Sequence, residues 1–420
     1  MKKVLLLVFV VAMALCTLNA CASARHTHSF GEWEQVQAPT CTQAGTKARV
    51  CSTCNAKEEE PIPMQGHDWK TGKYNATHHY TECGTCHETK DASAHTGNPC
   101  TGCDYAYSEG LEYKLADGGA GYVLAGMGDC TDVDLVVPAT YEGKPVVEVK
   151  AFAFQYSALT SVTLPSTVKT IWNAAFMHSS SLARVEIPEG VERIEGMAFS
   201  NCAALNDVVL PDSIRFIGGL VFEGTAHYAD TAKWEDGALY MGKHLIKAQD
   251  LSGTYAIREG TITVATYALS ANEDEKPNRI TSLTVPASVV YIGRAAFGDL
   301  NELESFTVAA DNAVYFSAGN CVIEKATGRL IAGCMKSEIP EDGSVTIIGS
   351  DAFRLEELEE ITIPVAIVEI EEFAFNWCDK FWRIRYKGTT AQWNAVKKAS
   401  GWKNSTASYF VVKCTDGDII

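Results

Sequence analysis

A pattern of apolar residues recurs every 23 residues between positions 159 and 380 of this 420-residue chain. Five copies share one frame, and they begin at Leu159, Leu182, Leu205, Ile280 and Leu358. In each copy, aliphatic residues stand three and five positions after the first, proline at six, isoleucine at twelve and phenylalanine at seventeen. Because these positions recur together in every copy, the pattern predicts a repeated structural unit rather than one globular core.

The spacing within a copy predicts short strands joined by turns. Apolar residues at offsets three and five alternate as they do in a strand with one buried face. The proline ends that strand because it lacks the N–H that a continuing ladder needs. A second short extended segment carries the isoleucine, and the phenylalanine packs the turn that follows. One such unit cannot bury its own apolar face, so copies must stack into a β-rich solenoid.

These residues resemble the BspA-like leucine-rich repeats of bacterial surface proteins, and the resemblance covers about residues 110–420. It implies a leucine-rich-repeat solenoid over residues 110–385, with partial copies around Leu135 and Phe353. Hairpins are predicted as insertions near residues 239–247 and 314–324. Residues 386–420 are predicted to form a C-terminal cap, with a short helix near 390–398 and a strand at 408–414.

The first 20 residues have the features of a bacterial export signal. Lys2 and Lys3 precede an apolar run that is too short to span a membrane. The ending Leu18-Asn19-Ala20-Cys21 resembles a lipobox, although Asn19 departs from the usual small residue. We therefore expect lipidation at Cys21 and an extracytoplasmic, lipid-anchored protein. Ordinary signal-peptidase cleavage and release is the alternative.

The charge balance excludes some partners. After loss of residues 1–20, 33 basic side chains face 52 acidic ones. Contacts with phosphate need Lys and Arg, so this balance disfavours nucleic acids, and it disfavours anionic membrane surfaces for the same reason. Membrane association is therefore expected only through the N-terminal lipid.

Residues 21–109 form a separate region that is rich in Cys and His. Seven of the fifteen cysteines and seven of the ten histidines of the chain lie between His26 and Cys103. The pattern predicts two zinc-ribbon-like modules. The stronger ligand set is two Cys-x-x-Cys pairs with ribbon spacing, namely Cys83, Cys86, Cys100 and Cys103. The weaker set has three cysteines and one histidine, namely Cys41, Cys51 and Cys54 with either His28 or His67.

Structural zinc is the favoured cofactor of this region, because an odd number of cysteines cannot all pair among themselves. A site closed by four protein ligands would leave no position for a catalytic water. A disulfide framework stays open as the alternative, since export leads to an oxidising compartment.

No catalytic residues or catalytic cofactor are predicted. The sequence holds neither a Gly-x-Ser-x-Gly nor a His-Glu-x-x-His motif. The segment from Gly237 to Lys243 resembles the start of a phosphate-binding loop, but His244 stands where a Ser or Thr should hold magnesium. A hairpin turn explains these glycines better.

A binding function is predicted for the outer face of the first strand of each repeat. Side chains at offsets two and four point away from the core, because side chains alternate along a strand. Stacking is expected to align them into one ladder: Ser161, Thr163, Arg184, Glu186, Asp207, Val209, Ser282, Thr284, Glu360 and Thr362. By family resemblance, the predicted function is that of an adhesin for an extracellular protein or glycan. A structural surface scaffold without a dedicated ligand is the alternative.

Overall fold

The computed structural model describes residues 26–74, 78–94, 98, 100, 106–270, 276–355, 357–404, 406–407 and 409–420. The chain divides into two compact units. The first comprises Met1–Lys73 and Tyr80–Ser93, and the second comprises Tyr74–His79 and Ala94–Ile420. The predicted export segment, Cys21 and Cys103 lie outside the described residues. Within the described residues, no helix has the length and apolar character needed to cross a membrane.

The Cys/His-rich region forms two small three-stranded sheets. The strands of the first sheet are β1 (Glu34–Gln37), β2 (Gly45–Val50) and β3 (Lys57–Ile62), which pair antiparallel in that order. The second sheet has the order β4 (Trp69–Tyr74), β5 (His78–Cys83) and β6 (Thr89–Ala94). One Cys-x-x-Cys pair follows β2 and the other begins at the end of β5, so each occupies the turn between two strands.

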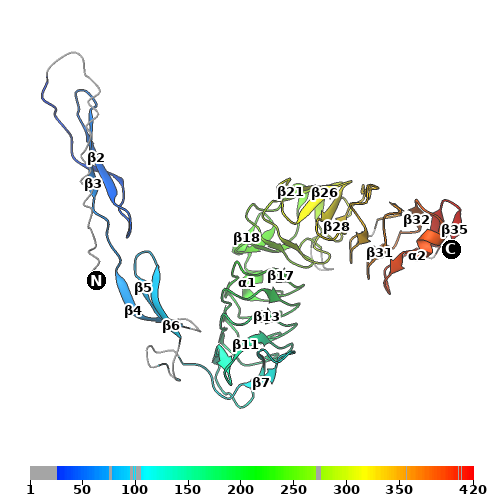
Figure 1. The fold of residues 1–420 in the computed structure, drawn as a ribbon, viewed down its shortest axis with the longest axis horizontal. Coiled ribbons are helices and arrows are strands. Elements are labelled where there is room, and N and C mark those ends of the chain that lie inside the picture. The colour runs from blue at the N-terminus through cyan, green and yellow to red at the C-terminus, as the bar shows by residue number, and fades with distance from the viewer. Residues whose placement is uncertain are drawn as a thin grey trace, which may run out of the picture. The chain divides into compact units, whose positions relative to one another are not determined.

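The first half of the solenoid has two parallel strands per coil, and each coil lies beside the next (Figure 1). The first strands form a sheet of β9 (Asp134–Val136), β12 (Ser161–Thr163), β14 (Arg184–Glu186) and β16 (Asp207–Val209). The second strands are β8 (Tyr122–Gly126), β11 (Lys144–Val149), β13 (Thr170–Ile171), β15 (Arg193–Ile194) and β17 (Phe216–Ile217). Residues exactly one repeat apart are partners, as in Val162↔Val185 and Ile171↔Ile194. The predicted 23-residue solenoid is confirmed.

Two strand pairs at the N-terminal end of the solenoid are antiparallel. Strand β7 (Glu112–Leu115) pairs antiparallel with β8, and β10 (Thr140–Tyr141) pairs antiparallel with β11. Strand β8 therefore receives an antiparallel neighbour on one side and the first parallel coil on the other.

The core of each coil is built on the repeated phenylalanine. The buried rings of Phe154, Phe176, Phe199 and Phe222 stack face to face, with successive centroids 5.1, 5.2 and 5.7 Å apart. Phe353 and Phe375 repeat this contact at 5.4 Å further along the chain. Each ring thus packs on the ring of the next coil, which no isolated repeat can provide.

Both predicted hairpins are present. The first is β19 (Ala238–Met241) with β20 (His244–Ala248), and the second is β26 (Tyr315–Ala318) with β27 (Cys321–Glu324). The segment before the first hairpin forms α1 (Ala226–Ala229), the 3-10 turn η1 (Thr231–Lys233) and β18 (Trp234–Glu235). Strand β20 then pairs parallel with β22 (Thr263–Val264), and β28 (Arg329–Gly333), which follows β27, pairs parallel with β29 (Ile347–Ile348). Each insertion therefore ends in a strand that pairs with the second strand of the next coil.

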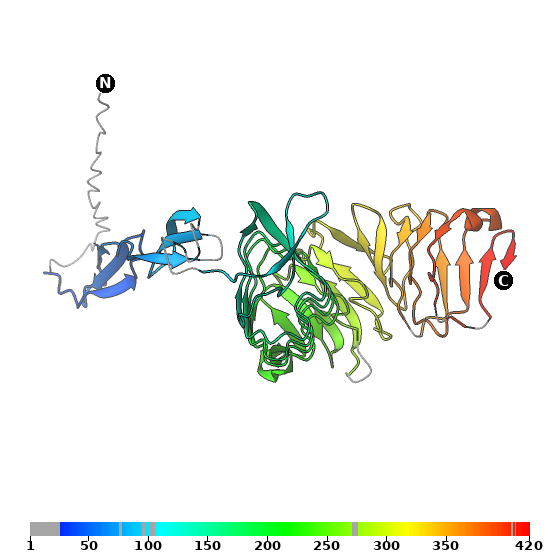
Figure 2. The same cartoon turned by 90° about the horizontal axis from the view of Figure 1, so that it is seen from below.

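The insertions divide the first-strand sheet into three. After the first hairpin it restarts as β21 (Ser252–Ala256), β23 (Arg279–Val285) and β25 (Ser305–Val308). After the second it restarts as β30 (Glu360–Ile363), β32 (Arg383–Tyr386) and β34 (Val411–Cys414), which Figure 2 shows side by side near the C-terminus. The second strands of these coils are β24 (Tyr291–Ile292), β31 (Glu369–Ile370) and β33 (Lys397–Lys398).

The C-terminus forms a modified last coil. The predicted helix is α2 (Thr390–Ala395), which begins with a capping box between Thr389 and Gln392 and buries Trp393. The predicted strand is β34, which pairs parallel with β32. Strand β35 (Gly417–Ile419) then pairs antiparallel with β34 and covers its free edge.

Candidate functional site

The first Cys/His cluster consists of His26, His28, Cys51 and Cys54. Their ligand atoms all lie within 4.8 Å of one another. The Sγ of Cys54 is 3.3 Å from Nδ1 of His28, and the Sγ of Cys51 is 3.8 Å from Nε2 of His26. The turn between β2 and β3 supplies the cysteines, and the segment that leads into β1 supplies the histidines.

The second Cys/His cluster consists of Cys41, His67, Cys83 and Cys86, whose ligand atoms also lie within 4.8 Å of one another. The Sγ of Cys86 is 3.3 Å from Nδ1 of His67, and the Sγ atoms of Cys41 and Cys83 are 3.8 Å apart. The turn between β5 and β6 supplies Cys83 and Cys86, whereas Cys41 comes from the loop between β1 and β2.

The two Cys-x-x-Cys turns have the same backbone structure. The amide of Asn55 donates to the carbonyl of Cys51, and the amide of His87 donates to the carbonyl of Cys83. Asn55 and His87 both adopt positive φ, at 56° and 59°. The sequence thus builds one type of knuckle twice, and such a knuckle holds two corners of a tetrahedral site.

An aromatic ring orients one histidine in each cluster. His28 stacks on Phe30 with centroids 5.5 Å apart, and His67 stacks on Trp69 at 4.6 Å. The Nε2 of His67 also lies 3.2 Å from a carboxylate oxygen of Glu88. A carboxylate on the second ring nitrogen is the usual partner of a metal-bound histidine, because it fixes the tautomer that leaves the other nitrogen free for the ion.

The knuckle amides favour the thiolate forms. For Cys51, the amide of Thr53 and then the ring of His26 lower the thiol pKa to about 5. For Cys83, burial opposes ionisation, but the amides of Cys86 and Thr85 outweigh it and bring the pKa to about 5. Burial raises the pKa of the Cys41 thiol to about 12. Thiolate is the form that binds a metal.

Both donor sets fit a closed tetrahedral metal site. Nitrogen and sulfur ligands in groups of four are typical of structural zinc, and four protein ligands leave no position for a catalytic water. Of the four buried apolar residues that the structure describes between residues 26 and 94, three are the cysteines Cys41, Cys51 and Cys83, and the fourth is Ala48. The two clusters can therefore hold metal ions in a region with almost no hydrophobic core.

The structure groups the described ligands differently from the expected sets, and Cys103 of the stronger set lies outside the described residues. Cys83 and Cys86 lie with Cys41 and His67, and not with Cys100, whose Sγ is instead 3.5 Å from Nδ1 of His79. Cys51 and Cys54 lie with His26 and His28, so His67 belongs to the other cluster. Spacing identifies a knuckle, but the folded loops decide which side chains complete it. His26 was missed, although its place two residues before His28 was visible in the sequence.

The ten predicted outward side chains of the solenoid all lie outside the core, as the alternation requires. They do not form one continuous ladder, because the two insertions separate them into three sheets. Six of them form what we call the first ladder, on β12, β14 and β16: Ser161, Thr163, Arg184, Glu186, Asp207 and Val209. Ser282 and Thr284 lie on β23, and Glu360 and Thr362 lie on β30.

Polar contacts run across these sheets from strand to strand. In the first ladder, Nε of Arg184 is 3.2 Å from Asp207, while Val209 stays 71% exposed. On β30, Glu360 pairs with Arg383 and, at 3.2 Å, with Arg385. Ser305 donates to Ser282 at 3.0 Å on the middle sheet. Of the three sheets, only that of the first ladder carries predicted outward residues on three adjacent strands.

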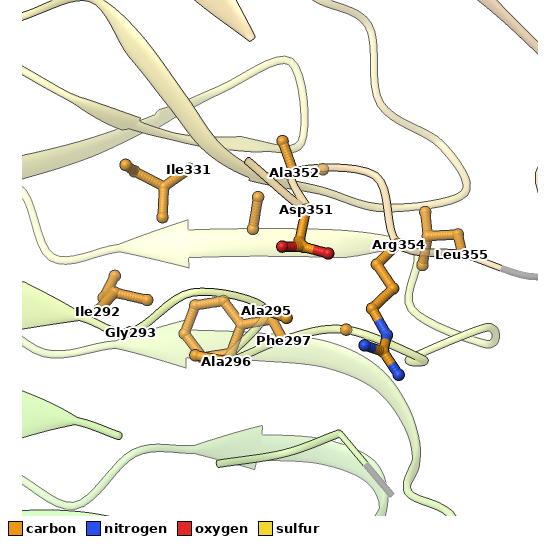
Figure 3. A pocket seen from close by; sticks show the side chains of 13 residues that line it. Ile292, Gly293, Ala295, Ala296, Phe297, Ile331, Asp351, Ala352, Arg354 and Leu355 are labelled. Carbon is orange, nitrogen blue, oxygen red and sulfur yellow. The ribbon is translucent and has the colours of Figure 1, made fainter. Parts of the chain in front are cut away.

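The cavity drawn in Figure 3 lies between coils and is too small for a substrate. It encloses about 10 Å³ beside Phe297, Ile331, Asp351 and Arg354, which is room for about one water. The Oδ2 of Asp351 pairs with Arg294, whereas its Oδ1 has no hydrogen-bond partner among the described residues. These groups join neighbouring coils.

A wider hollow opens at the C-terminal sheet. It encloses about 470 Å³ and is lined by Glu359, Asp379, Lys380, Trp382, Ala407 and Tyr409. The Trp382 and Tyr409 rings lie 6.0 Å apart.

The 23-residue coils match a known repeat. The family model for BspA type leucine-rich repeat regions matches residues 144–273, 275–318 and 332–396, in six copies. The chain belongs to this family. The match covers the coils on both sides of each inserted hairpin, as well as all of α2.

Solved structures of other leucine-rich repeat proteins are similar to this BspA-type chain. One from Eubacterium ventriosum is 16% identical, with 70% of this chain and 67% of that chain covered and a TM-score of 0.33. A leucine-rich cell surface protein from Faecalibacterium prausnitzii is 20% identical, with 70% and 98% covered and a TM-score of 0.29. The pneumococcal vaccine antigen PcpA is 17% identical, with 74% and 88% covered and a TM-score of 0.30. No curated protein matches the chain.

Proposed function

We propose that this BspA-type protein is a lipid-anchored surface adhesin that binds an extracellular protein or glycan through the first ladder. The observation that supports this most is the register of its outward side chains across three adjacent strands. Stacked coils that repeat one exposed strand create the extended surfaces that solenoids use for binding. The family and the export signal are consistent with a position outside the cytoplasmic membrane.

The chemistry of the first ladder favours a polar partner. Arg184, Glu186 and Asp207 are exposed, so they can form hydrogen bonds and ion pairs without losing a buried contact. The exposed Val209 adds one apolar contact at the edge. Such a mixed, open surface suits an extended partner rather than a small apolar ligand.

A binding screen of the chain from residue 22 against matrix proteins, mucins and glycans tests this proposal. We expect saturable binding that the triple variant Arg184→Ala/Glu186→Ala/Asp207→Ala weakens by at least about tenfold, or about 1.4 kcal/mol. The control Lys169→Ala/Glu192→Ala/Asp212→Ala removes the same charges from exposed positions outside the ladder and should bind normally.

Two other outcomes would show that the first ladder is not the binding site. Binding lost only in Trp382→Ala/Tyr409→Ala would move the site to the C-terminal hollow. No binding to any member of the panel would favour the structural scaffold.

We also propose that each Cys/His cluster holds one structural zinc ion. The four closely spaced ligands of each cluster and the Glu88 carboxylate behind His67 support this. Metal analysis of the purified chain should find two zinc ions per molecule, one for each cluster. Disulfide-linked cysteines without metal would contradict the proposal.

The anchor is proposed to be a lipid on Cys21. Labelled fatty acid should enter the wild-type chain and not the Cys21→Ala variant, which should no longer remain with the membrane fraction. Release of the unmodified wild-type chain would favour ordinary signal-peptidase cleavage.

A further inference from the structure

The second Cys/His cluster takes its ligands from both sides of a boundary in the sequence. Cys41 precedes β2 and belongs to the module of β1, β2 and β3. His67 lies before β4, while Cys83 and Cys86 lie at the turn between β5 and β6, so these three belong to the next module. The first cluster, in contrast, takes all its ligands from the first module.

We propose that the metal in the second cluster is a staple that fastens the first Cys/His module to the second. This inference rests on the proposed metal occupancy and adds a role for one of the two ions. Cys41 is the ligand that makes the connection, because the other three ligands already belong to one module.

Few other contacts can hold the two modules together. The chain passes from β3 to β4 through residues 63–68, which are mostly exposed, and one bond from the amide of Gln65 to the carbonyl of Thr40 ties this linker to the Cys41 loop. Ala48 is the one buried apolar residue described between residues 26 and 94 that is not a cysteine. A hydrophobic interface is therefore missing from the described part of these modules, and the metal would supply the connection.

The burial of Cys41 fits this role. Its side chain is only 4% exposed although it lies on a loop, and its Sγ approaches the buried Sγ of Cys83. A cysteine that served only the first module would have no reason to be buried against the knuckle of the second. The two clusters also differ in composition, because the first offers two cysteines and the second three.

Cobalt substitution of the chain from residue 22 tests the ligand set. In a background that lacks the first cluster (Cys51→Ala/Cys54→Ala), one cobalt ion should bind with the charge-transfer absorption of three thiolates. Adding Cys41→Ser should reduce this absorption to that of two thiolates and weaken cobalt binding by at least about tenfold. Cys130→Ser, which changes a cysteine outside both clusters, is the matched control and should change neither.

Limited proteolysis of the zinc-loaded chain tests the staple itself. Cleavage within residues 63–68 should be slow in the wild type and in Cys130→Ser, and fast in Cys41→Ser and after chelation. Removing the first cluster alone should leave this linker protected, because its ligands do not cross the boundary.

The outcomes separate this inference from the metal proposal beneath it. If the wild type binds no metal, the proposed zinc sites fail. If it binds two ions but Cys41→Ser is without effect while Cys100→Ser lowers the absorption, the grouping expected from the sequence holds and the staple is rejected. A Cys41–Cys83 disulfide in the unreduced chain, detected by mass spectrometry of its peptides, would also reject it.

Discussion

At the scale of single residues, His244 is a buried polar group with a defined structural role. It lies at the start of β20, with Nδ1 2.8 Å from the hydroxyl of Thr263 and Nε2 3.1 Å from the carbonyl of Pro211. A carbonyl only accepts, so Nε2 carries the proton and Nδ1 accepts from Thr263. The neutral ring is thereby satisfied, and burial lowers its pKa below the ordinary 6.5.

This environment predicts acid sensitivity of the solenoid. Because the folded pKa of His244 is depressed, its contribution to stability is present above the unfolded pKa of 6.5. It is lost as pH falls, since the unfolded chain takes up the proton first. We expect the urea midpoint to decrease between about pH 7.5 and about pH 5.5. His244→Gln should cost about 1–3 kcal/mol at the higher pH and reduce the decrease. His178 lies partly exposed on a turn. The control variant His178→Gln should therefore retain the full decrease in the urea midpoint.

Residue-scale prediction from sequence worked for the core and less well for the Cys/His ligands. The apolar positions of a repeat, such as Val185, Ile194 and Phe199, are buried as the periodicity indicates, because each copy repeats the same environment. The ligands have no such repetition. Cys41 joins a knuckle that begins 42 residues further along the chain, at Cys83, and no spacing rule specifies that loop contact.

At the scale of elements, the phenylalanine stack should carry much of the solenoid's stability. Phe199 packs between Phe176 and Phe222 at 5.2 and 5.7 Å and is fully buried. Phe199→Ala should therefore cost about 3–5 kcal/mol, from lost burial and the cavity left behind. Phe152→Ala, at a ring that is 55% exposed, should change stability by no more than about 0.5 kcal/mol. If urea unfolding showed the same loss of stability for Phe199→Ala and Phe152→Ala, the stacked rings would not be a main source of the solenoid's stability.

The hairpins were predictable as elements, but their effect on the neighbouring sheet was not. Alternating apolar residues on either side of Gly242 indicate β19 and β20, and the glycine adopts the positive φ of 62° that the turn requires. Strand β21 pairs with β23 and not with β16, and α1, η1, β18 and the hairpin lie between β16 and β21 along the chain. The pattern of a single repeat does not specify whether the first strands on the two sides of an insertion still pair, so the predicted single ladder became three sheets.

At the scale of the whole molecule, the two units should be stabilised by different means. The solenoid buries continuous layers of aliphatic and aromatic side chains, whereas the Cys/His region buries cysteines. Both described Cys/His clusters lie in the first unit. Metal removal should therefore act on one unit and leave the other unchanged, because a bound metal stabilises only the part of the chain whose folding creates its site.

We expect calorimetry of the zinc-loaded chain to show a transition of the Cys/His region that a chelator abolishes, while the solenoid transition keeps its midpoint. Hydrogen exchange should locate the change. After chelation, peptides covering β2, β3 and β5 should exchange rapidly, and peptides covering β12 to β17 should keep their protection. The Phe199→Ala variant should give the reverse pattern, with a lower solenoid midpoint and unchanged protection at the knuckles. If chelation also lowered the solenoid midpoint, the two units would be coupled, and the Cys/His region would have to be regarded as part of the solenoid's folding unit rather than as a module with its own source of stability.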